Sequence, residues 1–470
     1  GVDCTADSCA SGTCLFVADH GLCPEGQVCS TVAGCLDDDA SDPRVSVDVE
    51  ASYPALSDGL FLTSRSHLVG SPDMPGGTVP LVTLHVSSGA AEDTFPLQVE
   101  VELVDFSTPA SAVVPLAPGE STTLSLSPSL DLAALFELRA ARPGVVHALV
   151  RAGDQVVWEQ SQPVTITSRN TALLDEVDLS YLSVFVTPHD SDGIVAELLS
   201  TATDAMPGLG MLGYQPLESY EEVTLGARSF YWMDLVLAQP GETVSFRFDE
   251  SRGSSQGSVV LLDEAAYERL ERGLTDFDTV CGVTSPVVGT VYECPALPGG
   301  TYYLVYLNGA PSGTWSASIT RSLTMEGVVR FHLHALYATL QGWGLRYVNA
   351  PADFLAVPSQ TVHYPSESVG TLSGNCLDGT VLFAAALEAM EMQPFLLLNP
   401  SAGHAYLGVA LWRDSPLLLA LETTMIGTRP FIDAYFQGLA ELDEDLGAGR
   451  LIPIDVSASR AAGIRPAPYM

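Results

Sequence analysis

The sequence predicts a multidomain protein with a small disulfide-rich N-terminal module, two antiparallel β-sandwiches and a C-terminal α+β domain. Three observations support this fold class. Six of the nine cysteines fall near the N-terminus, short runs of alternating apolar and polar residues fill two long stretches, and an apolar helix that starts at a cysteine precedes a hairpin. With 470 residues, the chain is long enough for three or four domains.

The first segment, residues 1–43, has many cysteines and almost no core-forming residues, so it needs covalent cross-links to fold. Six cysteines allow fifteen connectivities, and the sequence does not choose between them. A zinc site is the alternative, but the CxxC pairs typical of zinc are missing. The acidic stretch Leu36–Pro43 is predicted to be a linker. The cysteines predicted to form disulfides here are Cys4, Cys9, Cys14, Cys23, Cys29 and Cys35.

Two stretches show the period-2 alternation of strands, residues 44–170 and residues 217–321. Gly, Pro, Ser and Asp separate the runs, which predicts an immunoglobulin-like sandwich for the first stretch and a second sandwich for the other. Cys281 and Cys294 are expected to form a disulfide in the second. Between them, residues 171–216 are predicted to be a helical connecting segment that can also be part of the catalytic domain.

The second sandwich contains the run Leu297–Tyr303, with the sequence LPGGTYY. This run resembles one strand of the bacterial pre-peptidase C-terminal family, a small jelly-roll-like sandwich that accompanies secreted enzymes. The resemblance implies an accessory role in binding or folding.

The C-terminal domain, residues 322–470, contains the residue most suited to chemistry. Val381–Met390 is apolar, free of Gly and Pro, and long enough to be a buried helix. Cys376 then lies in the first turn of that helix, at the positive end of its dipole. This position favours the thiolate, which is the nucleophilic form of cysteine.

A hairpin is predicted after this helix, formed by Ala405–Leu411 and Leu417–Leu421. If Arg413 is the centre of the turn, His404 lies directly opposite Glu422 on the same face. The carboxylate can then accept a hydrogen bond from the imidazole and orient it toward Cys376.

The order Cys376, His404, Glu422, with the cysteine on a helix and the other two on neighbouring strands, resembles the transglutaminase-like superfamily of papain-type thiol enzymes, in its bacterial secreted type. The resemblance covers roughly residues 327–426, with GNCLDGTVLFAAALEAM, GHAYLGV and LALETT as its most specific parts. Glu422 stands where the family usually has Asp. The resemblance implies a catalytic triad, with Gln360 as a candidate oxyanion donor beside the backbone N–H of Cys376.

Neither a cofactor nor a metal is expected. His332 and His334 are two residues apart, so they do not share a helix face. Asp190 and Asp192 lack the other ligands of a calcium loop, and a turn with a helix cap explains them better.

The charge balance argues against two classes of binding partner. The chain has 57 acidic and 19 basic residues, a net charge of -38, and no lysine. Such a surface repels nucleic acid and anionic membranes. Two explanations of this composition stay open. A high negative charge keeps a protein soluble in a salty environment, and an enzyme without lysine cannot cross-link its own side chains.

These observations predict a secreted or cell-surface thiol enzyme that attacks amide bonds of an extracellular protein or peptide and forms a thioester. No hydrophobic signal or membrane-spanning run is visible, so we expect a processed portion of a longer protein. The alternative function is a catalytically inactive surface or matrix-binding protein that uses its sandwiches for interaction. Oligomeric state, and hydrolysis versus transfer, stay open.

Overall fold

A computed structural model describes residues 5–10, 13–18, 22–24, 27–30, 34–37, 47–69, 79–89, 95–174, 178–190, 192–205, 213–215, 218–238, 242–253, 256–274, 278–285, 287–298, 300–349 and 359–467. Cys4 and most of the predicted linker lie outside these residues, as do the side chains of Cys9, Cys14 and Cys29. Disulfide bonds join Cys23 to Cys35 and Cys281 to Cys294. The chain therefore contains at least these two of the predicted bridges.

The chain divides into two compact units, which are not placed relative to one another. The first comprises Gly1–Phe185, Pro351–Val362 and Ala458–Met470, and the second comprises Val186–Ala350 and His363–Ser457. This grouping differs from the boundaries drawn from the sequence, which assigned all of residues 322–470 to one domain.

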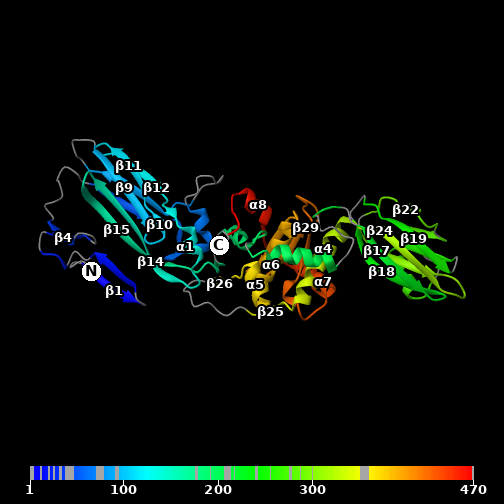
Figure 1. Ribbon diagram of the computed structural model, residues 1–470. Helices are drawn as coiled ribbons and strands as arrows, with labels where there is room; N and C mark the ends of the chain where they lie inside the picture. Colours follow the sequence, from blue (N-terminus) through cyan, green and yellow to red (C-terminus); the bar gives the residue numbers. More distant parts are fainter. Residues whose placement is uncertain are drawn as a thin grey trace. The chain divides into compact units, whose positions relative to one another are not determined.

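The first unit consists mainly of antiparallel strands (Figure 1). A six-stranded sheet has the order β11-β9-β14-β15-β7-β6, and a three-stranded sheet has the order β12-β8-β5. Residues from both sheets form one core, including Leu84 of β8, Val99 of β9 and Ala148 of β14. These side chains occupy alternate positions of their strands, which is the pattern that predicted them.

The elements before Val186 and the strand β26 are β1 Thr5–Ala10, β2 Thr13–Ala18, β3 Gln27–Ser30, β4 Gly34–Asp37, β5 Val47–Ser52, β6 Leu56–Ser57, β7 Leu60–Phe61, η3 Thr63–Leu68, β8 Val82–Ser88, β9 Phe95–Leu103, β10 Ser107–Thr108, β11 Ala110–Leu116, β12 Ser121–Leu126, β13 Ser129–Leu130, α1 Leu132–Phe136, β14 Arg142–Ala152, β15 Gln155–Ile166, β16 Thr171–Leu173, η4 Ser180–Phe185 and β26 Ser359–Thr361.

The second unit begins with helix α2 and two four-stranded antiparallel sheets, ordered β17-β24-β19-β22 and β18-β23-β20-β21. Phe248 of β19, Leu261 of β20 and Trp315 of β24 share one core between them. Asp190 accepts hydrogen bonds from the first backbone N–H groups of α2, so the cap interpretation of this residue is confirmed.

The elements of this part are α2 Ile194–Ala205, β17 Glu218–Leu225, β18 Ser229–Ala238, β19 Ser245–Gly253, β20 Gly257–Asp263, α3 Glu264–Glu271, β21 Cys281–Thr284, β22 Val291–Glu293, β23 Gly300–Asn308 and β24 Trp315–Ser322.

The rest of the second unit is an antiparallel sheet of order β30-β29-β28-β31 with helices packed on it. Helix α6 packs against β28 and β29, and α7 packs against β30, in the yellow to red part of Figure 1. Helix α6 is buried along most of its length, as its uninterrupted apolar sequence predicted. Among the described residues, no helix is long and apolar enough to cross a membrane.

The elements of this last part are α4 Met325–Trp343, β25 Arg346–Tyr347, α5 Pro365–Thr371, β27 Ser373–Gly374, α6 Cys376–Ala389, β28 Pro394–Asn399, β29 His404–Ala410, β30 Leu418–Leu421, η5 Thr423–Met425, α7 Phe431–Gly447, β31 Ile452–Asp455 and α8 Val456–Ala461.

Candidate active site

Cys376 is the first residue of helix α6 and is 9% exposed. Asn375 caps the helix, because its side-chain oxygen accepts hydrogen bonds from the backbone N–H groups of Leu377 and Asp378, at 2.9 and 3.0 Å. The cap occupies the N–H groups of Leu377 and Asp378, whereas the backbone N–H of Cys376 has no acceptor within the helix and can stabilise negative charge. The predicted position of the thiol at the helix start is confirmed.

Asp378 holds this helix end in place from a buried position, with 1% of its area exposed. Its carboxylate accepts hydrogen bonds from the backbone N–H groups of Asn375, at 2.9 Å, and His363, at 2.7 Å. The His363 ring lies 3.2 Å from the same carboxylate, and this contact raises the pKa of His363 above its usual value. One acidic side chain thus ties the turn before Cys376 to the segment before α5.

Gly379 lets a second segment approach the thiol closely. A Cβ atom at this position would lie 2.9 Å from the hydroxyl oxygen of Thr423, which is closer than real contacts allow. Thr423 also donates a hydrogen bond to the backbone carbonyl of Cys376, at 3.4 Å. The segment that follows β30 is therefore packed directly on the first turn of α6.

The hairpin exists, but its predicted register is wrong by two residues. Leu407 pairs with Leu421 and Gly408 with Ala420, so the turn is centred one residue later than Arg413. Asp414 adopts a positive φ of 63° in this turn, and Leu411 bonds to Leu417 rather than Ser415. A shift of two residues keeps every side chain on its predicted face, because the period of a strand is two.

His404 and Glu422 are consequently still neighbours. Nε2 of His404 lies 2.7 Å from Oε2 of Glu422. A hydrogen bond with Cys376 is the largest cause, and contacts with Glu422 and with a further carboxylate add to it, so that the pKa of His404 is raised from 6.5 to about 12. The imidazole is held as a cation between the thiol and the carboxylate.

Glu422 is buried and acts as the N-cap of the short helix η5, with Oε1 accepting the N–H of Thr424 at 2.7 Å. Burial opposes its charged form, but the hydrogen bonds from His404 and Thr424 outweigh burial and hold its pKa below the usual value. Glu422 therefore remains a carboxylate beside the imidazolium.

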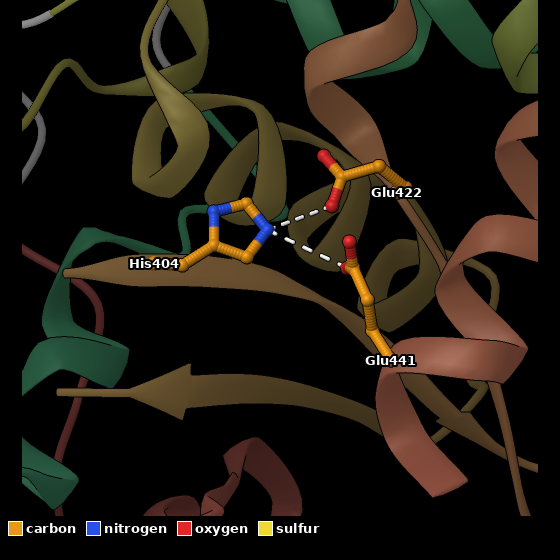
Figure 2. A group of neighbouring side chains, drawn as sticks. All are labelled: His404, Glu422 and Glu441. Carbon is orange, nitrogen blue, oxygen red and sulfur yellow. Dashed lines mark hydrogen bonds and ion pairs between the residues drawn. The ribbon is translucent and has the colours of Figure 1, made fainter. Parts of the chain in front are cut away.

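Sequence analysis missed Glu441, which belongs to α7 and lies 3.5 Å from Nε2 of His404 (Figure 2). The signal that could have identified it is the spacing of Ala434, Gly438, Glu441 and Asp445, which places all four on one face of the helix. The other members of this set are buried.

His404, Glu422 and Glu441 each offer one possible metal-ligand atom, and these atoms lie within 4.8 Å of one another. This is a donor set that a divalent cation can use. The Nε2 atom of His404 carries a proton between the two carboxylates, and a metal would have to displace that proton.

Three further residues were considered from the sequence. Gln360 is in β26 of the first unit, paired with Ala172, so its oxyanion role stays a prediction. His332 is fully buried, and its Nδ1 lies 2.8 Å from the carbonyl of Val328 within α4. His334 stacks on Phe431. The two histidines thus have packing roles.

Tyr347 of β25 is a second residue that the sequence did not single out. Strand β25 pairs with β27 immediately before Cys376. Burial raises the pKa of Tyr347, and the negative charge of Cys376 raises it further. Its ring is 37% exposed, so it can contact a molecule that approaches the thiol.

No protein-family model and no curated protein matches this chain. Among solved structures, a disulfide-linked pilus of Bacillus endospore appendages is 8% identical, covers 25% of this chain and 96% of its own, and has a TM-score of 0.16. The IMPa metallopeptidase in complex with T-antigen is 18% identical over 29% of this chain and 17% of its own, with a TM-score of 0.16. The secreted serine protease VesC from Vibrio cholerae is 10% identical over 50% of this chain and 45% of its own, with a TM-score of 0.11. Likenesses this low carry no information on fold or function.

Proposed function

We propose that this protein is a thiol enzyme of the transglutaminase-like type that acts on amide bonds through a thioester at Cys376. One observation carries the proposal: Nε2 of His404 lies 2.7 Å from the carboxylate of Glu422, and a hydrogen bond with the thiol of Cys376 is the largest cause of the raised pKa of the same ring. A structural histidine gains nothing from being oriented toward a cysteine at a helix start, whereas a nucleophile and its base require it.

The proposed reaction begins with the thiolate of Cys376 attacking an amide carbonyl carbon. The new S–C bond pushes the carbonyl electrons onto oxygen, and the backbone N–H of Cys376 stabilises this oxyanion. As the C–N bond breaks, the imidazolium of His404 gives its proton to the leaving amine. The product is an acyl thioester on Cys376 with a neutral His404.

Resolution of the thioester needs an incoming water or amine. Neutral His404 removes a proton from this nucleophile as it attacks the carbonyl carbon, the C–S bond breaks, and the thiolate–imidazolium pair returns. Glu422 keeps its charge throughout and orients the ring, as the acid does in other triads.

We further propose that the protein is secreted or displayed on the cell surface, and that its substrate is an extracellular protein or peptide. Two disulfides indicate an oxidising compartment. The net charge of -38 favours basic substrates at low ionic strength. The sheets before the C-terminal part are proposed to be an immunoglobulin-like sandwich and a pre-peptidase C-terminal-like sandwich with accessory roles.

The test is incubation with a glutamine-containing peptide library and a fluorescent primary amine, with the Cys376→Ala variant beside the wild type. Incorporation of the amine indicates acyl transfer, and release of ammonia or a cleaved peptide without it indicates hydrolysis. Absence of any product that depends on Cys376 would refute the enzyme proposal and favour a surface-binding protein.

A further inference from the structure

Two carboxylates converge on one nitrogen of His404 (Figure 2). Oε2 of Glu422 lies 2.7 Å from Nε2, and Oε2 of Glu441 lies 3.5 Å from the same atom. The other ring nitrogen is left for Cys376. A single orienting carboxylate is enough for a thiol triad, so the second one needs an explanation.

Both carboxylates are anchored in the same manner, with one oxygen fixed and the other directed at the ring. Oε1 of Glu422 accepts the backbone N–H of Thr424, at 2.7 Å. Oε1 of Glu441 accepts a hydrogen bond from the side chain of Gln437, one turn earlier on α7, at 2.8 Å. Glu422 has 3% of its side chain exposed and Glu441 has 24%, so the two differ mainly in access to solvent.

Helix α7 is held close to the end of β30, which determines where Glu441 lies. The backbone carbonyl of Ala434 accepts the N–H of Glu422, at 3.0 Å. A Cβ atom on Gly438 would lie 2.7 Å from the backbone nitrogen of Leu421, so only glycine permits this approach. Glu441 follows Gly438 by one turn on the same face and therefore points toward the ring.

The Oε2 atom of Glu441 is shielded from solvent and has no hydrogen-bond partner. Its approach to His404 is an ion-pair distance that is too long for a hydrogen bond. A buried carboxylate oxygen without a hydrogen bond is costly, and the imidazolium N–H is the donor that can satisfy it. A small rotation of the ring would move this N–H from Glu422 to Glu441.

We propose that Glu441 is a second positioning residue for His404, which shares the Nε2 proton with Glu422 and takes it over when Glu422 is lost. This inference rests on the proposed function, because it assigns Glu441 a role in the same reaction. By accepting the N–H in more than one ring orientation, the pair keeps the proton on Nε2 and the ring aligned while the other ring nitrogen gives its proton to the leaving amine and later regains one.

The titratable groups that face His404 come from every element around it. They are Cys376 of α6, Glu422 after β30, Glu441 of α7, and the phenols of Tyr347 in β25 and Tyr406 in β29. The phenols stay neutral, because burial raises the pKa of both. The carboxylates of Glu422 and Glu441 thus contact Nε2, and Cys376 interacts with the same ring.

The experiment measures the pKa of His404 by NMR of the ring, in full-length protein with the Cys376→Ala substitution. Removing the thiol leaves the two carboxylates as the only neighbouring anions among the facing groups. We expect Glu441→Gln to lower the pKa of His404 by roughly one unit. We expect the double substitution Glu422→Gln with Glu441→Gln to lower it by more than the two single changes added together, because each carboxylate compensates for the other.

Asp443→Asn is the matched control, since it removes one charge from an exposed position of the same helix. Gln437→Ala provides a second variant that leaves both carboxylates in place, and it should produce a smaller shift in the same direction. If Glu441→Gln changes the pKa of His404 no more than Asp443→Asn does, or if the single shifts simply add, the inference is wrong. Because NMR needs no substrate, a wild type without amide turnover would refute only the proposed function.

Discussion

Nε2 of His404 lies 2.7 Å from Oε2 of Glu422, although the two residues are not directly opposite each other in the hairpin. In the observed register, the ladder ends at the pair Leu407–Leu421, and Glu422 is already the cap of η5. The contact is therefore diagonal and depends on the bend at the end of β30. The length of the Glu side chain suits this diagonal reach.

Cys376 should be the single free thiol that an electrophile can label. It is the free cysteine among the described residues, and it stands beside a protonated imidazole. Alkylation with iodoacetamide under non-reducing conditions, followed by mass spectrometry, should add one tag per chain. A tag on an N-terminal cysteine, or an unlabelled Cys376, would contradict this expectation; the Cys376→Ala variant is the control.

The charge state of His404 should depend on Cys376. The hydrogen bond with the thiol is the largest cause of the raised pKa, so removing it in Cys376→Ala should lower the pKa of His404. A raised pKa stabilises the fold below the unfolded value of 6.5, and this contribution is lost as pH rises through about 12. In the variant, the loss should be complete at lower pH. Ring NMR and urea denaturation across the alkaline range would test both statements, and identical titrations in the two proteins would refute them.

Gly438→Ala should destabilise the second unit and misplace Glu441. The added Cβ would meet backbone atoms of Leu421 and Glu422 within 2.8 Å, so α7 must move away from β30. We expect a loss of roughly 1–3 kcal/mol, measured by urea denaturation. Gly447→Ala, at the end of the same helix, meets nothing within 4 Å and should be neutral or stabilise by up to about 1 kcal/mol. Equal effects of the two substitutions would rule out a close helix approach.

Asp378→Ala should lower both stability and the reactivity of the thiol. It leaves the buried N–H groups of Asn375 and His363 without their acceptor, at a cost of roughly 2–3 kcal/mol. The start of α6 would then fray, and the alkylation rate of Cys376 should fall. Asp443→Ala on α7 serves as the exposed control. An unchanged alkylation rate in Asp378→Ala would show that the cap does not position the thiol.

The sequence predicted the parts of this site that local patterns determine. The apolar run after Cys376 predicts a buried helix, so the position of Cys376 followed from this pattern, whereas the cap by Asn375 was found in the structure. The hairpin register depended on the conformation of Asp414, and a positive φ at a non-glycine residue has no reliable local signal. The face of His404 was still correct, because the error was an even number of residues.

Glu441 could not be recognised in the same way, because its role depends on tertiary packing. An acidic residue in an acidic run usually faces solvent, and only the docking of α7 on β30 brings this one to the imidazole. Gly438 permits that docking. In a sequence, however, a glycine within a helical pattern indicates first a lower helix stability. The sequence shows that Glu441 shares a helix face with Gly438, but it does not show that this face packs against β30.

The short separation of the site residues along the chain has a consequence for the order of folding. His404 and Glu422 are 18 residues apart, whereas the bond from Asn170 to the carbonyl of Val362 in the first unit spans 192 residues. Closing the longer loop costs about 2 kcal/mol more chain entropy, so we expect the hairpin to assemble first when the denatured protein refolds. The described disulfides close loops of 12 and 13 residues, so they are expected to form at least as early as the hairpin. Early burial of Cys376 would then protect these bridges from exchange with its thiol.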